Sequence, residues 1–307
     1  MIPANETFNG TFPFTPHFTD TPGFRMHYVD EGNGPVVLCL HGEPTWGYLF
    51  RDLIRQLSTD HRVIVPDHMG FGKSETPTDR TYWLQDHINN LEQFILALDL
   101  QHITLVMHDF GGPAGMGLAA RYPERIARII SINGPTAFGQ ESLLEKLTAN
   151  AGESPWFSWI LTAHAQDRLE PVLQELRYNI LSTLKLNGFE RNDLITDNWL
   201  QAYGSAFPTP EACAGAIGWA KGFAAGSHVF EAPTEEAKQI ISALPALAIW
   251  GAADHTLHGK YFLPLFRETF PAGQVYELPE AGHYSPEDAP GTISLLVRQF
   301  LTLHRNA

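Results

Sequence analysis

Short apolar runs separated by helical stretches constrain the fold of this chain more than any other feature. The runs, each bounded by turn residues, predict buried parallel strands at residues 36–40, 63–66, 103–107, 126–132, 247–250 and 274–278. The intervening stretches have the apolar spacing of helices, at residues 48–57, 83–98, 113–121, 231–244 and 263–270. This alternation predicts an α/β protein with a mostly parallel, doubly wound sheet. In such sheets ligands bind beyond the carboxyl ends of the strands.

Two departures from the alternation refine this prediction. Residues 24–29 alternate in polarity and precede the Asp30-Glu-Gly-Asn-Gly34 turn, which predicts an antiparallel hairpin strand entering the sheet. Residues 135–229 are helix-like and rich in aromatic residues, with no strand pattern. We interpret them as a helical cap inserted into a core formed by residues 1–134 and 230–307. A cap at this place would cover the carboxyl edge of the sheet and exclude water.

Composition narrows the classes of partner. Twenty Lys and Arg against 34 Asp and Glu give a formal charge of −14, which disfavours nucleic acids and anionic membranes but leaves small neutral substrates open. Cys39 and Cys213 lie far apart in the sequence and predict no disulfide framework. The first residues resemble no signal peptide, and no apolar run is long enough to span a bilayer, so we expect a cytoplasmic protein.

The segment Leu105-Val-Met-His-Asp-Phe-Gly-Gly-Pro-Ala-Gly115 is a strand that stops at a polar residue and restarts as a glycine-rich helix. This is the layout of the nucleophile elbow, G-x-S-x-G, in which a strained turn exposes the central side chain. Asp109 occupies the central position, Gly111 matches the second glycine, and Met107 replaces the first. The alternative is that Asp109 only caps the following helix.

Two further residues match the order in which α/β-hydrolases place their catalytic residues, nucleophile, then acid, then histidine. Asp254 follows the strand predicted at residues 247–250, and His283 follows the last predicted strand. Asp254 could instead be a turn residue, and His283 a loop histidine without a role. Three such residues at three strand ends favour a catalytic triad of Asp109, Asp254 and His283, in an α/β-hydrolase fold.

The loop after the strand at residues 36–40 begins His41-Gly-Glu-Pro44. In this fold that loop gives one backbone N–H to the oxyanion hole, and the residue after the nucleophile gives the other. This predicts the backbone amides of Glu43 and Phe110. The glycines of residues 67–74 lack the full spacing of a phosphate-binding loop, and we interpret them as structural.

A carboxylate nucleophile changes the task of the histidine. An aspartate is already ionised near neutral pH and needs no general base in order to attack. Asp109 would displace a leaving group from an sp3 carbon and form an alkyl ester, and His283, oriented by Asp254, would activate the water that hydrolyses this ester.

Motifs along nearly the whole chain resemble those of the haloalkane dehalogenases, in the branch with Glu after His-Gly. They are Phe12-Pro-Phe-Thr-Pro-His-Phe18, Met26-His-Tyr-Val-Asp-Glu-Gly32, His41-Gly-Glu-Pro-Thr-Trp46, His108-Asp-Phe-Gly-Gly112 and Ala281-Gly-His283. The resemblance implies hydrolysis of a haloalkane to an alcohol and halide, with water and a small apolar molecule as substrates, and without metal or other cofactor. Phe207 and Pro208 resemble the pocket-lining Phe-Pro of that branch.

Phe110 is the main departure from the family. The family usually has Trp there, and its indole N–H helps to bind the departing halide, whereas Phe has no donor. The surroundings of Trp159 resemble those of the second halide donor, a cap Trp, although Trp159 could equally be a packing residue.

Loss of one preorganised donor typically costs about a hundredfold in rate. The departure therefore keeps related Asp-nucleophile reactions open, namely epoxide hydrolysis, with Tyr178 and Tyr203 as candidate proton donors, and β-lactone opening. A non-enzymatic receptor on the same fold is a further alternative.

Overall fold

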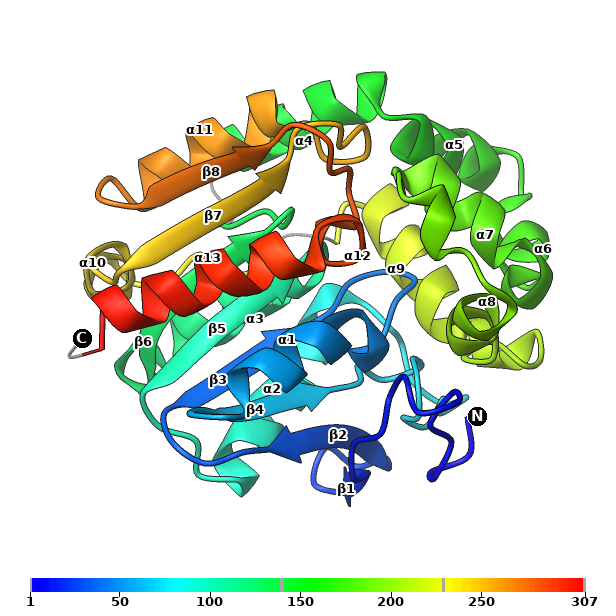
Figure 1. Cartoon of the computed structure of the whole chain (residues 1–307). Coiled ribbons are helices and arrows are strands. Elements are labelled where there is room, and N and C mark those ends of the chain that lie inside the picture. Colours follow the sequence, from blue (N-terminus) through cyan, green and yellow to red (C-terminus); the bar gives the residue numbers. More distant parts are fainter. Residues whose placement is uncertain (1, 139–140, 228–229, 306–307) are drawn as a thin grey trace.

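The computed structural model describes residues 2–138, 141–227 and 230–305, and these form one eight-stranded sheet covered by helices (Figure 1). The strand order across the sheet is β1-β2-β4-β3-β5-β6-β7-β8. The strands span β1 His17–Thr19, β2 Met26–Glu31, β3 Val36–Leu40, β4 Arg62–Pro66, β5 Ile103–His108, β6 Ile126–Ile132, β7 Ala246–Gly251 and β8 Gln274–Leu278. The α/β class and the mostly parallel sheet predicted from the sequence are confirmed.

All six predicted parallel strands are present, because strands buried on both faces form continuous apolar runs that are easy to recognise. Every residue of β5, β6 and β7 is buried. The predicted antiparallel strand is β2, but it extends to Glu31 through residues expected in the turn. It pairs with β1 and β4 rather than with β3. The three-residue β1 was not predicted.

Helices cover both faces of the sheet (Figure 1). Helices α1 and α13 pack together on one face, while α3 contacts both α2 and α10 on the other. The helices of this core span η1 Gly47–Phe50, α1 Arg51–Leu57, α2 Leu84–Ala97, α3 Gly111–Arg121, η2 Pro123–Arg125, α10 Glu235–Ser242, α11 Gly259–Thr269, α12 Ser285–Asp288 and α13 Pro290–Leu303. Across the described ranges, no helix combines the length and apolar character needed to cross a bilayer.

The chain between β6 and β7 is helical before it reaches α10, and we call α4 to α9 the helical insertion. Its helices span α4 Glu141–Glu153, α5 Pro155–Ala165, α6 Leu169–Leu173, α7 Leu176–Asn187, η3 Asn192–Leu194, α8 Asp197–Gly204, η4 Glu211–Cys213 and α9 Ala214–Ala224. Helices α5 to α9 lie beyond the carboxyl ends of the central strands (Figure 1). Local signals set their ends: Ser154 caps α5 ahead of Pro155, and Gly188, at φ 104°, ends α7.

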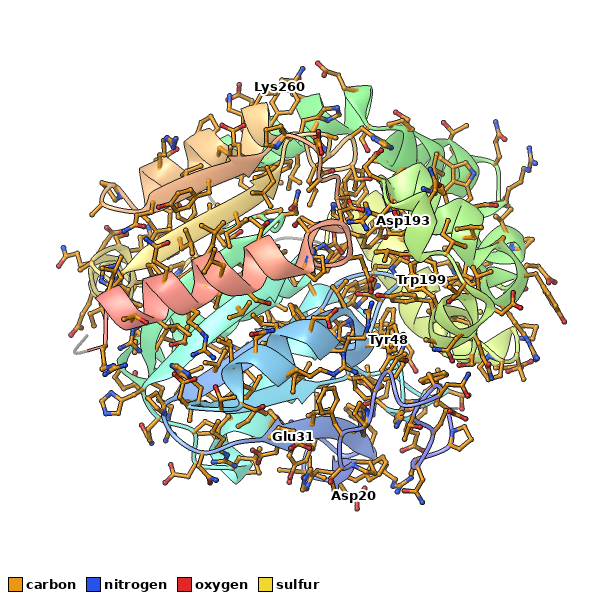
Figure 2. All side chains as sticks on the ribbon, viewed as in Figure 1. Asp20, Glu31, Tyr48, Asp193, Trp199 and Lys260 are labelled. Atoms are coloured by element: carbon orange, nitrogen blue, oxygen red, sulfur yellow. The ribbon has the colours of Figure 1, made fainter. Side chains whose placement is uncertain are left out.

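One buried carboxylate joins the insertion to the core. Glu287 of α12 accepts hydrogen bonds from the Tyr203 hydroxyl at 2.5 Å and the Trp199 indole at 3.2 Å, both from α8. Arg51 of α1 pairs with the same carboxylate through both of its terminal nitrogens. Figure 2 labels Trp199 and Tyr48, which lie on the two sides of this junction. The paired charge holds α8 against the core.

Candidate active site

The strand order reverses between β3 and β5, because the chain runs from β3 to β4 on one side and then returns to β5 on the other. Crevices at such switch points are the usual ligand sites of doubly wound sheets. The loop of residues 41–43 leaves the carboxyl end of β3, and Asp109 directly follows β5. The site is therefore built where the topology favours one.

Asp109 lies in a strained turn between β5 and α3. Its φ is 51°, in the left-handed region that non-glycine residues rarely adopt. Gly111 permits the turn, because a Cβ there would lie 2.2 Å from the Leu40 carbonyl oxygen. The departure at Met107 is accommodated by Gly115, where a Cβ would lie 2.3 Å from the Met107 sulfur. The elbow geometry is thus present without the first glycine.

The Asp109 carboxylate is held by donors on both oxygens. Oδ1 accepts the backbone N–H of Glu43 at 2.8 Å, and Oδ2 lies 3.5 Å from His283 Nε2. Burial acts to raise the pKa of Asp109, but the hydrogen bond and charge of His283, with the backbone N–H of Phe110, bring it below the ordinary value. Asp109 is therefore ionised at neutral pH, and both predicted oxyanion-hole amides act on its carboxylate.

His283 is paired with Asp254 on its other ring nitrogen. Nδ1 donates to Asp254 Oδ2 at 2.9 Å, and Asn133 Nδ2 donates to the same oxygen at 2.8 Å. Asp254 Oδ1 accepts the backbone N–H groups of Thr256 and Leu257, both at 2.8 Å. Four donors thus stabilise a buried Asp254 carboxylate and orient the imidazole. The structure brings all three predicted triad residues together.

Two carboxylates act on the His283 imidazole. Burial alone lowers the pKa of this histidine, but the charge of Asp254 and the hydrogen bonds to Asp109 and Asp254 raise it to about 10. His283 is therefore protonated while Asp109 is ionised. If Asp109 were neutralised in an ester, one of the two negative charges would be lost and the pKa of His283 would fall.

Three residues that contact the triad were not predicted, namely Asn133, His108 and Gly188. Asn133, at φ 46° directly after β6, also accepts the Gly251 N–H at 3.0 Å and the Ser285 hydroxyl at 2.6 Å. His108 Nε2 donates to the His283 carbonyl at 2.9 Å, and the His283 N–H donates to the Gly188 carbonyl at 2.9 Å. The position of Asn133, a polar residue at the end of a predicted strand, is the signal that could have identified it.

The Glu43 side chain is a buried acid next to the nucleophile. It is 4% exposed, and neither carboxyl oxygen has a hydrogen-bond partner among the described residues. Burial, and then the charge of Asp109, raise the pKa of Glu43 well above its ordinary value. The raised pKa favours the neutral form of this carboxyl, which adds no negative charge beside Asp109.

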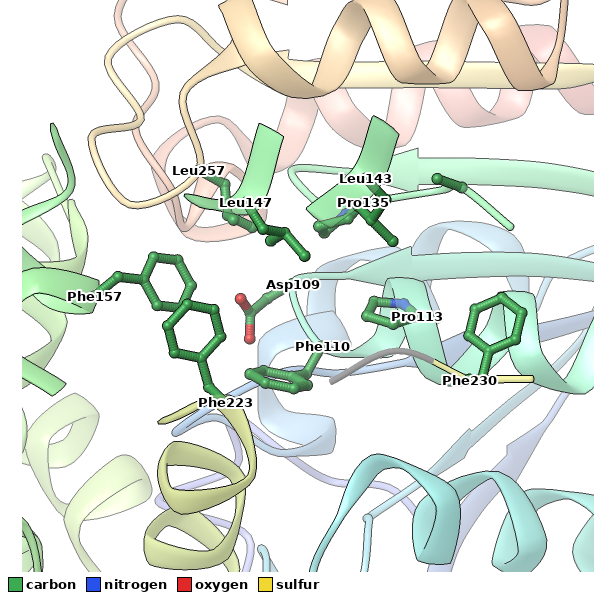
Figure 3. Close-up of a pocket in the computed structure, with 11 residues that line it drawn as sticks. Asp109, Phe110, Pro113, Pro135, Leu143, Leu147, Phe157, Phe223, Phe230 and Leu257 are labelled. Carbon is green, nitrogen blue, oxygen red and sulfur yellow. The ribbon is translucent and has the colours of Figure 1, made fainter. Parts of the chain in front are cut away.

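The Asp109 carboxylate faces an apolar pocket that encloses about 480 Å3, part of it open to solvent (Figure 3). Except for Asp109, the described residues that line it have hydrocarbon side chains, and they come from both the core and the insertion. They are Phe110, Pro113, Pro135, Ala137, Leu143, Leu147, Phe157, Phe223, Phe230 and Leu257. This lining accommodates an apolar molecule and offers no side-chain donor for a leaving group.

Of the predicted halide- or substrate-binding residues, only Phe110 lines this pocket. Trp159 stacks on Trp156 with ring centroids 5.2 Å apart and lines an outer hollow, so the structure does not bring it to Asp109. Phe207 is buried against Phe71, and the Pro208 carbonyl accepts a bond from Arg177. Phe157, two positions before Trp159 on α5, is the residue of this helix that faces Asp109 (Figure 3).

The two cap tyrosines considered as proton donors also lie elsewhere. Tyr178 is 80% exposed, and the buried Tyr203 donates to Glu287. Trp219 of α9 stacks on Phe110 at 4.5 Å, but its indole N–H is bonded to His87 Nε2. The N–H of the indole that packs on Phe110 thus already donates to His87 and is not free to bind a leaving group.

A family model described as the alpha/beta hydrolase fold matches residues 35–290, which include every residue of the triad. The chain belongs to the alpha/beta hydrolase fold family. A solved structure of a mutant epoxide hydrolase from Bacillus megaterium supports the same fold, with a TM-score of 0.75 and 24% identity over 93% of this chain and 100% of that one. The chain is accordingly an enzyme of this superfamily.

Curated relatives of this hydrolase carry out different reactions. A cis-3-alkyl-4-alkyloxetan-2-one decarboxylase of Shewanella oneidensis is 31% identical over 94% of this chain and 89% of its own length. A haloalkane dehalogenase of Mycolicibacterium paratuberculosis is also 31% identical, over 90% of this chain and 89% of its own. The similarity therefore establishes the superfamily, and the pocket must distinguish between the reactions.

Proposed function

We propose that this hydrolase uses Asp109 as a nucleophile on β-lactones, the oxetan-2-ones, that carry apolar alkyl groups. The observation that carries the proposal is an ionised Asp109, paired with His283, at the edge of a pocket whose other described lining is hydrocarbon. Such a pocket binds alkyl groups by excluding water. It also requires a leaving group that needs no donor from the wall.

A β-lactone meets this requirement. Attack of Asp109 Oδ2 on ring carbon C4 breaks the C4–O1 bond, and O1 departs as a carboxylate that remains attached to the substrate through C2. A carboxylate is a weakly basic leaving group, since carboxylic acids have pKa values near 4. Ring opening also releases the strain of the four-membered ring, so the step needs neither a halide donor nor a proton donor.

The opened intermediate is an Asp109 ester of C4 with a carboxylate at C2. Its C2–C3 bond can break to release CO2, the electron pair forming the C3=C4 double bond while the C4–O bond returns its pair to Asp109. The products are an alkene and CO2, and no water is consumed. An apolar wall favours this step, because the loss of CO2 removes a carboxylate charge that the pocket solvates poorly. The S. oneidensis relative, named as a decarboxylase of such lactones, supports this route.

The test is incubation with a cis-3,4-dialkyl oxetan-2-one in 18O-labelled water, with products identified by mass spectrometry. We expect an alkene and CO2, and no 3-hydroxy acid. A 3-hydroxy acid with 18O in its hydroxyl group, to which the label passes through Asp109 over several turnovers, would show that water cleaves the ester instead, and would overturn the decarboxylation step. No turnover of lactones of any chain length would overturn the proposal.

Haloalkane dehalogenation is the second candidate, favoured by the haloalkane dehalogenase at 31% identity. Asp109 would form the same kind of ester, and water activated by His283 would release an alcohol. The free halide would then have to form in a pocket where Phe110 provides no donor and Trp159 is distant. We therefore expect bromide release from 1-bromoalkanes to be slow relative to lactone turnover, and faster bromide release would reverse the order of the candidates.

Epoxide opening ranks below both. An epoxide oxygen leaves as a strongly basic alkoxide and needs a proton donor, but Tyr178 is exposed and Tyr203 is bonded to Glu287. The substrates that we propose are thus an apolar lactone or haloalkane, with water as co-substrate only where the ester is hydrolysed.

A further inference from the structure

A groove on the outer surface of the helical insertion lies directly outside the apolar pocket. It encloses about 970 Å3, part of it open to solvent, between α4, α5 and the end of α9. The described residues that line it carry no charge; they are Leu144, Leu147, Thr148, Ala151, Gly152, Ser158, Leu161, Thr162, Phe223, Ala224 and Gly226. No residue of the triad lies in this groove.

The groove and the pocket share two lining residues, Leu147 and Phe223. Both are buried, at 8% and 7% exposure, and their side chains form the partition between the two spaces. A change of rotamer at Leu147 or Phe223 would open this partition, so that an occupant of the pocket could extend past them into the groove.

The outer wall of the groove exposes apolar side chains to water. Leu144 and Leu161 are each 42% exposed, which makes them two of the few large apolar side chains left open to solvent. At Thr162 the groove meets the hollow beside Trp159, which is also lined by the exposed Val172. Clustered exposed apolar side chains beside a binding pocket mark a surface that is covered in use.

We propose that this groove binds the distal part of a long alkyl chain of the substrate, whose reactive ring lies in the pocket at Asp109. An alkyl chain is favoured over other occupants because the groove carries no charge and shares the apolar residues Leu147 and Phe223 with the pocket. The proposal rests on the proposed function only for the identity of the reactive ring. It places long-chain rather than short-chain substrates at this site, with Leu147 and Phe223 as the passage between the two parts.

Binding tests the groove without catalysis. Asp109→Asn protein, which lacks the nucleophile, is titrated calorimetrically with 1-alkanols from hexanol to hexadecanol. We expect Kd to fall about twofold to fourfold for each added methylene, and to go on falling beyond the length that fills the pocket, because each methylene leaves water. A Kd that stops falling with the shorter alkanols would overturn the proposal.

A matched pair of surface variants locates the chain. Leu161→Glu, in the same Asp109→Asn background, should remove the gain for long alkanols by tenfold or more, because it puts a charge in the groove. Leu295→Glu alters a 66% exposed leucine on α13, away from the groove, and should retain the gain. Equal weakening of all chain lengths by Leu161→Glu, or no effect of it, would contradict the assignment.

Two other occupants are tested with the same variants. If sedimentation showed that Leu161→Glu converts a dimer into a monomer, or if it abolished binding to phosphatidylcholine vesicles without altering alkanol affinity, the groove would be a docking surface and the proposal would be wrong. The lactone assay separates this proposal from the proposed function. Alkanol binding that strengthens with chain length, without lactone turnover, would support the groove and reject the reaction. Lactone turnover with an alkanol affinity that does not depend on chain length would support the reaction and reject the groove.

Discussion

The floor and the wall of the pocket differ in how they treat polar groups. On the floor, formed by the strand ends, Asp254 accepts four hydrogen bonds and Asp109 is held by amides and by His283. Among the described residues, the wall presents only hydrocarbon side chains, to which the insertion contributes Leu143, Leu147, Phe157 and Phe223. The difference teaches that the polar groups for breaking a bond come from the core, whereas the apolar surface against which a substrate would lie comes from the core and the insertion together.

The largest effect on activity should come from removing the negative charge of Asp109 on the pocket floor. Asp109→Asn keeps the shape of the side chain but not its nucleophilicity, so we expect kcat/KM for lactones and bromoalkanes to fall about 10^4-fold or more. Steady-state kinetics measure this, and thermal melting controls for folding. Residual activity within tenfold of that of the wild-type enzyme would show that Asp109 is not the nucleophile.

Replacing the base should separate the two reactions. In His283→Gln, water is no longer activated, so bromoalkane turnover should fall about 10^3-fold and the alkyl ester should accumulate on Asp109. Intact-protein mass spectrometry detects this adduct. Alkene formation from a lactone consumes no water and should fall much less. An equal loss of both activities would indicate that lactones too are processed through hydrolysis.

A hydrogen-bond donor introduced into the hydrocarbon wall should reduce the difference in polarity between the floor and the wall. Phe110→Trp adds an indole N–H next to Asp109, and we expect bromide release to rise about 100-fold, since one preorganised donor to a developing anion has roughly that effect. Phe230→Trp serves as the control, because it adds an indole to the same pocket on the far side of Pro113 from Asp109 (Figure 3). Equal gains in both variants would mean that position is unimportant.

The charge pair on the floor should appear in the pH dependence of stability. The pKa of His283 is raised to about 10, so its stabilising contribution is fully present below pH 6.5 and is lost as the pH rises through 10. We expect the Tm of the wild-type protein to fall toward that of His283→Gln over this interval. A Tm difference that stays constant from pH 6 to pH 10.5 would contradict the raised pKa.

The smallest effect concerns Glu43, the buried acid next to Asp109 on the pocket floor. Because its pKa is raised, the wild-type protein loses stability as the pH rises above about 4.5, where the unfolded chain ionises first. Glu43→Gln does not titrate, so its Tm relative to that of the wild type should increase by a few degrees between pH 4 and pH 7. A relative Tm that decreases over this range would show that Glu43 is ionised in the folded protein.

The sequence predicted the sheet well and the small elements poorly. The bounds of β3, β6 and β8 agree residue by residue with the prediction, because buried parallel strands are continuous apolar runs. The half-buried, three-residue β1 carries too little pattern to recognise. Helix α13 was not predicted, although its buried Ile293, Val297 and Phe300 have helical spacing. Its start at Pro290, directly after the short α12, has the composition of a loop.

The same distinction holds within the site. Asp109, Asp254 and His283 could be predicted because each follows a strand, and parallel strands end at one edge. Residues of the insertion depend instead on how each helix is rotated about its axis. Phe157 and Trp159 are about 200° apart around α5, and the contact of Phe157 with Phe223 at 4.3 Å orients the helix. Sequence spacing alone could not choose between them.

The bond from the His283 N–H to the Gly188 carbonyl has a consequence for the evolution and engineering of this enzyme. The insertion contributes to the backbone position of the histidine as well as to the wall. A chimaera that exchanged α4 to α9 for the equivalent helices of a relative would alter selectivity and also shift the imidazole, unless the exchanged segment kept a tight turn at the end of α7. An exchange of the whole insertion would therefore change both selectivity and rate. An exchange that ends before Gly188 would change selectivity and keep the bond that positions His283.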